Sequence, residues 1–188
     1  VALTSCMKNE VYVPTCDAPI SFEVANYEAQ TRAGAFAYDS FGVNAWSRDA
    51  AASESVLMMD GEIVEYVNGK WTTETPYYWP INGTVDFIAY YPNPTIDGGK
   101  HKPTIGYDYD GENTYTYTNY EVGDVDLMYA DKAIRFSANK TAGENTAGIN
   151  SGFEGVPTLF HHALAKVNFK VKNANPYETD NRAITYEI

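Results

Sequence analysis

Few residues of this chain combine the types and spacings that chemistry requires, and the first is a cysteine near the start. Cys6 follows Leu3, Thr4 and Ser5. Small residues before a cysteine let a signal peptidase bind, and the thiol can then receive a diacylglyceryl group, as in bacterial lipoprotein precursors. We therefore predict lipidation at Cys6 and treat the residues before it as a processing segment. The alternatives are an ordinary buried cysteine or a disulfide with Cys16, the second cysteine of the chain.

Histidines and acidic residues offer little further chemistry. His161 and His162 are adjacent, and neighbours in a strand point to opposite faces, so the pair cannot easily share one ion. Residues 108–112 carry three acids but lack the later ligands of a calcium loop, and weak calcium binding there is only an alternative. The sequence contains no nucleotide-binding, zinc or nucleophile-elbow motif. We expect no metal, no cofactor and no enzymatic activity.

Aromatic side chains are abundant, with 16 tyrosines, eight phenylalanines and three tryptophans. Trp71, Tyr77, Tyr78 and Trp79 could form a flat platform on which a sugar stacks. In β-rich proteins such rings more often belong to the core or to cross-strand pairs. A glycan platform is therefore the alternative interpretation of these four residues.

Charge and length narrow the class of protein. The chain has 188 residues and a formal net charge of −12, so it should repel nucleic acid and anionic lipid. Any contact with a membrane is expected through a lipid anchor alone. The length suits one domain, or one domain and a fragment of a second.

The elements that must position these residues are short strands. Apolar and polar residues alternate in many segments that turns rich in Gly and Pro separate. Asn68-Gly69 predicts a type I′ hairpin turn, and a second hairpin turns at residues 110–113. Residues 158–165 are ambiguous between strand and short helix, and 50–55 between a helical turn and a loop. Strands are predicted at residues 20–24, 41–46, 63–67, 70–72, 85–92, 105–109, 114–118, 125–130, 166–172 and 183–188.

This pattern predicts an all-β fold: a mostly antiparallel β-sandwich with long loops and at most one short helix. We divide the chain into three parts. Residues 1–19 are the signal remnant, the lipidated cysteine and a tether. Residues 20–175 form the β-sandwich domain. Residues 176–188 are a linker and the first strand of a second, truncated domain.

Four segments occur in an order that resembles the fimbrillin-like family. They are Tyr-Tyr-Trp-Pro (77–80), Asp-Phe-Ile-Ala-Tyr-Tyr-Pro (86–92), Asp-Leu-Met-Tyr-Ala (126–130) and Phe-His-His-Ala-Leu-Ala-Lys-Val-Asn-Phe-Lys-Val (160–171). The family comprises surface lipoproteins and type V pilus subunits of Bacteroidales-type Gram-negative bacteria. The resemblance implies sandwich domains of transthyretin-like character and a place in the outer membrane, at the cell surface, in a fimbrium.

The resemblance also implies an assembly mechanism. Structural subunits of the family lose their first strand to an Arg-specific protease, and a donor strand from the next subunit fills the groove. Arg32 followed by Ala33 matches this processing site best, with Arg48 as the competitor. The implied partners are other pilus subunits, together with a host or bacterial surface glycan or protein for an adhesin. The alternative function is a stand-alone glycan-binding surface lipoprotein.

Overall fold

The computed structural model describes residues 15–25, 36–118, 120, 121, 123, 125–137 and 155–164. These residues form strands and a single 3-10 turn, so the predicted all-β fold is confirmed. The strands are β1 (Thr15–Pro19), β2 (Phe22–Val24), β3 (Ser40–Arg48), β4 (Val56–Val67), β5 (Lys70–Thr73), β6 (Tyr78–Pro80), β7 (Thr84–Tyr91), β8 (Thr104–Gly106), β9 (Thr114–Thr116), β10 (Met128–Ala130), β11 (Ala133–Phe136), β12 (Val156–Thr158) and β13 (Phe160–His162), and the turn is η1 (Ile96–Gly99).

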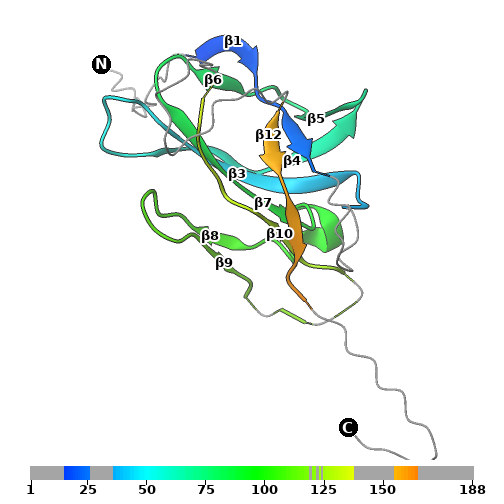
Figure 1. Cartoon of the computed structure of the whole chain (residues 1–188). Coiled ribbons are helices and arrows are strands. Elements are labelled where there is room, and N and C mark those ends of the chain that lie inside the picture. Colours follow the sequence, from blue (N-terminus) through cyan, green and yellow to red (C-terminus); the bar gives the residue numbers. More distant parts are fainter. Residues whose placement is uncertain are drawn as a thin grey trace, which may run out of the picture.

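One nine-stranded sheet makes most of the fold (Figure 1). Its order is β12-β2-β5-β4-β3-β7-β10-β13, and β11 also pairs with β7. The two end strands, β12 and β13, are separated in sequence by Leu159 alone. One stretch of chain therefore pairs with β2 on one side and β10 on the other, and the sheet curls until it is nearly closed. We call this stretch, residues 156–162, the seam.

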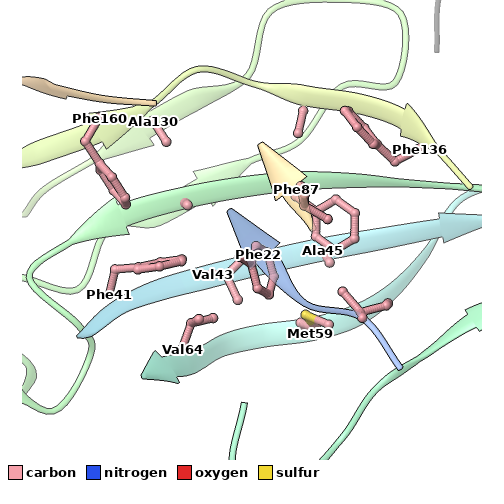
Figure 2. Packing of buried hydrophobic residues seen from close by; sticks show 14 of the residues in the cluster. Phe22, Phe41, Val43, Ala45, Met59, Val64, Phe87, Ala130, Phe136 and Phe160 are labelled. Atoms are coloured by element: carbon pink, nitrogen blue, oxygen red, sulfur yellow. The ribbon is translucent and has the colours of Figure 1, made fainter. Parts of the chain in front are cut away.

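The core lies inside the curled sheet (Figure 2). Strands β3 and β7 pair along seven residues each in the middle of the sheet. Alternate side chains of both strands point inward, as period-two alternation requires. The inward residues are Phe41, Val43 and Ala45 of β3 and Val85, Phe87 and Ala89 of β7, all at most 4% exposed. The strand predicted at residues 85–92 is thus β7.

The opposite face of β3 and β7 is covered by the hairpin β8–β9, a separate two-stranded sheet (Figure 1). Trp46 stacks on Tyr107 with a centroid distance of 4.3 Å and an interplanar angle of 4°. In β9 the tyrosine is half-buried and its threonine neighbours are exposed, as the alternation predicts. Because both faces of the central strands are covered, even their polar residues are buried, including Asn44 and Asp86.

Most predicted strands appear, with shifted ends. The turn between β4 and β5 has positive φ at Asn68 and Gly69, 53° and 83°, as a type I′ turn requires. The ambiguous segment at 158–165 begins as strand, and residues 50–55 form no helix. The chain was expected to be a tether up to Pro19, but residues 15–19 form β1, because β6 offers them a pairing partner. The strands predicted at 166–172 and 183–188 lie outside the described residues.

Candidate functional site

Strand β2 occupies a slot between two other strands. Phe22 is paired with Trp71 of β5 in antiparallel register and with Val156 of β12 in parallel register. Backbone hydrogen bonds extend this pairing at both ends. The N–H of Ile20 donates to the Tyr77 carbonyl at 2.7 Å, and the N–H of Ala25 donates to the Thr158 carbonyl at 3.1 Å. We call the space that β2 fills the β2 slot.

The side chains of β2, and of Ile20 just before it, complete the core. Ile20 and Phe22 are 2% and 5% exposed, whereas Glu23 is exposed. The ring of Phe22 meets the rings of Phe41 and Phe87 edge to face, with centroid distances of 5.7 and 5.5 Å (Figure 2). Burying a side chain of this size contributes about 1.5–3 kcal/mol relative to leaving it exposed. Removal of β2 would therefore open a groove lined by aromatic and aliphatic side chains.

The chain after this slot is anchored separately. Phe36 stacks on Phe160 at a centroid distance of 4.3 Å, and Tyr38 stacks on Tyr91 at 3.7 Å. Sequence reasoning missed both residues, although their alternate spacing is the pattern of a chain with one face buried. Phe36 and Tyr38 hold the chain to the body independently of β1 and β2.

Of the residues predicted to be processed, only Arg48 lies in the described part of the chain. Cys6, Arg32 and Ala33 lie outside the described residues. Arg48, the competitor of Arg32, is the last residue of β3 and is paired with Thr84 of β7. Its guanidinium lies 3.8 Å from the centre of the Tyr109 ring, and its Nε donates to the Ala52 carbonyl at 3.2 Å.

The four residues of the predicted glycan platform lie in different surroundings. Trp71 is half-buried and packs on Phe41 at a centroid distance of 5.5 Å. Trp79 packs on Phe87 at 5.7 Å. Burial, together with the nearby Glu62 carboxylate, raises the pKa of Tyr77 to about 12.

Tyr78 is the most exposed member of the platform, at 38%. Because Tyr78 and Trp79 are neighbours in β6, their side chains point to opposite faces. Stacking of a sugar on these residues stays a prediction.

The histidines and the acidic turn are engaged in local contacts. His161 Nε2 lies 2.9 Å from Asp131 Oδ1, and His162 Nδ1 lies 2.7 Å from Asp126 Oδ2. The two rings thus have separate carboxylate partners. Among the described residues, no three His, Cys, Asp or Glu side chains gather where they could hold a metal ion.

A lysine side chain occupies the turn that bears the three acids. Lys132 Nζ donates to the carbonyls of Gly111 and Asp108 at 2.9 and 3.4 Å. The Asp108 carboxylate accepts the N–H groups of Asp110 and Gly111. An ammonium group and backbone donors therefore already satisfy these oxygens.

Comparison with known protein families identifies the chain. A family model described as fimbrillin-like matches residues 31–187. The chain belongs to the fimbrillin-like family. Comparison with curated proteins gave no match, and comparison with solved structures gave none either.

Membership of the fimbrillin-like family confirms the resemblance on which the sequence analysis relied. The family is one of structural pilus subunits rather than enzymes, and it implies association with other pilus subunits at the cell surface. In the described part of this fimbrillin-like chain, no helix is long and apolar enough to cross a bilayer. The match starts at residue 31, so β1 and β2 lie before the region that the family model covers.

Proposed function

We propose that this fimbrillin-like chain is a pilus subunit whose β2 slot exchanges strands. In this proposal the precursor is exported as a lipoprotein that is acylated at Cys6. An Arg-specific protease then cuts after Arg32, β1 and β2 leave, and a strand from another subunit enters the slot. Main-chain hydrogen bonds to β5 and β12 hold the new strand, and its alternate side chains replace those of Ile20 and Phe22.

The observation that carries the proposal is the position of β2 in the chain and in the fold. Both β1 and β2 precede Arg32, and every other described strand follows it. A cut after Arg32 therefore detaches a core-forming strand. The sheet from β5 to β13 stays continuous, whereas β12 and β6 lose the strands with which they pair. Phe36 and Tyr38 keep the new N-terminal segment attached, through ring contacts that do not involve β2.

Arg48 is a poorer processing site on the same grounds. A protease binds its substrate as an accessible extended segment, whereas β3 lies between β4 and β7 and pairs with both. A cut after Arg48 would also remove Phe41, Val43 and Ala45 from the core. These contacts favour Arg32, and the start of the family match at residue 31 agrees with that choice.

Mass spectrometry of the N-terminus tests the proposal directly. Protein taken from its native cell surface should begin at Ala33 after trimming, and its precursor should begin at acylated Cys6. The Arg32→Gln variant should stay full-length and monomeric when an Arg-specific protease is added. The matched control, Arg48→Gln, should be trimmed and should assemble like the unmodified chain. Assembly of Arg32→Gln, or a mature chain that begins after Arg48, would contradict the proposal.

A further inference from the structure

One position of the β2 slot, that of Phe22, restricts most strongly which side chain can fill it. Phe22 is the only β2 side chain that meets two core rings edge to face, those of Phe41 and Phe87. Such pairs are attractive beyond the area they bury, because the positive edge of one ring meets the negative face of the other. An aliphatic side chain at this position would fill part of the space but would lose both ring contacts.

Gly155 fixes where that ring sits along the slot. A Cβ placed on Gly155 would lie 2.6 Å from the carbonyl carbon of Phe22 and 2.9 Å from the backbone nitrogen of Glu23. Backbone atoms of a paired strand cannot move away without breaking the ladder. The strand therefore fits against β12 only because residue 155 has no side chain. No local pattern in the sequence indicates this contact.

The remaining positions of the slot are less selective. Ile20, two residues before Phe22, is also buried and points into the core. Glu23 is exposed, so its side chain is free to vary. Val24, two residues after Phe22, is half-buried and packs against the core. The slot thus presents one aromatic position with an aliphatic position two residues before it and another two residues after it.

We propose that the β2 slot recognises its incoming strand by an aromatic side chain at the residue that lies beside Gly155. This inference rests on the proposed strand exchange and names the chemistry of the partner: a strand of a second pilus subunit. That strand has an aliphatic residue two positions before its aromatic residue. Gly155 is the positioning residue that sets the register of the strand.

Peptide exchange measures this selectivity. The full chain is cut after Arg32 by limited digestion, and fluorescent peptides of residues 15–32 compete with the severed segment for the slot. The wild-type peptide and its Glu23→Ala variant should bind equally well. Loss of a buried phenylalanine side chain costs about 3–5 kcal/mol in protein cores, so the Phe22→Ala peptide should bind about a hundredfold more weakly or worse. A peptide of residues 166–172 serves as an independent probe, because Val167 and Phe169 repeat the spacing of Ile20 and Phe22; it should bind, and its Phe169→Ala variant should not.

Substitution in the slot itself gives a second measurement. Gly155→Ala should weaken the binding of every peptide. The added methyl group would collide with backbone atoms, which every bound strand has at that place. Gly123→Ala is the matched control, since nothing lies within 4 Å of a Cβ at that position. Equal binding of the wild-type and Phe22→Ala peptides would overturn the aromatic selectivity and leave strand exchange standing. Failure of every peptide, wild-type included, would instead overturn the proposed exchange.

Discussion

At the scale of single residues, a buried carboxylate joins the outer hairpin to the sheet. Asp86 of β7 is 1% exposed. It accepts the Tyr107 hydroxyl at 2.9 Å and the backbone N–H of Arg135 at 2.6 Å. A buried carboxylate persists only when donors satisfy it, and here the donors come from two different segments.

Asp86→Ala should therefore destabilise the fold strongly. The substitution removes the acceptor of the Arg135 N–H and leaves the Tyr107 hydroxyl with only its contact to the Ser55 hydroxyl. Each hydrogen bond to a charged group is worth about 1.5–3 kcal/mol. We expect the free energy of unfolding in urea to fall by about 3 kcal/mol or more. The control is Asp110→Ala, which removes the surface ion pair with Arg135 and should change stability by about 1 kcal/mol or less. Equal losses in the two variants would show that Asp86 does not join the layers.

Half-buried tyrosines make the stability of the fold depend on pH in the alkaline range. Burial raises the pKa of Tyr107 to about 12, and burial together with Tyr120 does the same for Tyr117, from an ordinary value of 10. Folding therefore favours the neutral phenol. Its contribution to stability is fully present below pH 10 and is lost as the pH rises from 10 towards 12.

Unfolding measured between pH 8 and 12 tests this expectation. The free energy of unfolding should be flat up to about pH 10 and then fall, together with a rise in tyrosinate absorbance. Tyr117→Phe should flatten the fall, because phenylalanine cannot ionise. A wild-type stability that stays constant up to pH 12 would contradict the effect of burial.

At the scale of elements, β2 is a part of the core that a cut at Arg32 would free from the rest of the chain. It contributes Phe22 to the core, and Ile20 just before it is also buried, but the strand is only three residues long. Its pairing partners lie far from it in sequence. After a cut at Arg32 the segment that bears β1 and β2 is held by non-covalent contacts alone. Its binding then follows mass action like that of any ligand.

The melting temperature of the cut chain should consequently rise with protein concentration. The uncut chain is the control, and its melting temperature should not depend on concentration because its strand is covalently attached. Differential scanning calorimetry over a wide range of concentrations makes the comparison. A cut chain whose melting temperature is independent of concentration would mean that β2 contributes little to the core.

At the scale of the whole molecule, charge opposes association between copies. The formal net charge is −12, so two subunits repel each other as they approach. Salt screens this repulsion, with a Debye length of about 8 Å at physiological ionic strength. The trimmed chain should thus assemble faster as sodium chloride is raised from low concentration to the physiological range. Light scattering follows the rate, and a rate that falls with salt would mean that local opposite charges control the encounter.

Much of this fold could be predicted from the sequence, because neighbouring residues specify strands and tight turns. The Asn68-Gly69 turn and the alternation at residues 114–118 fixed both hairpins. The closure of the sheet could not be predicted from the sequence, because no local pattern indicates that residues 156–158 lie beside residues 22–24. The same limit concealed the β2 slot: Phe22 was recognisable as a strand residue, whereas Gly155 acquires its role only from backbone that is distant in sequence.

The position of the seam in the sequence determines when the β2 slot is completed during folding. Strand β5 is made soon after β2, but β12, the other wall of the slot, comes from nearly the opposite end of the described chain. Pairings between such distant segments form late, because the long intervening loop must close first. A chain that is incompletely synthesised or folded therefore has no complete β2 slot, even when strands of other subunits are nearby. If strands exchange as proposed, exchange would have to wait until the sheet had closed around β2.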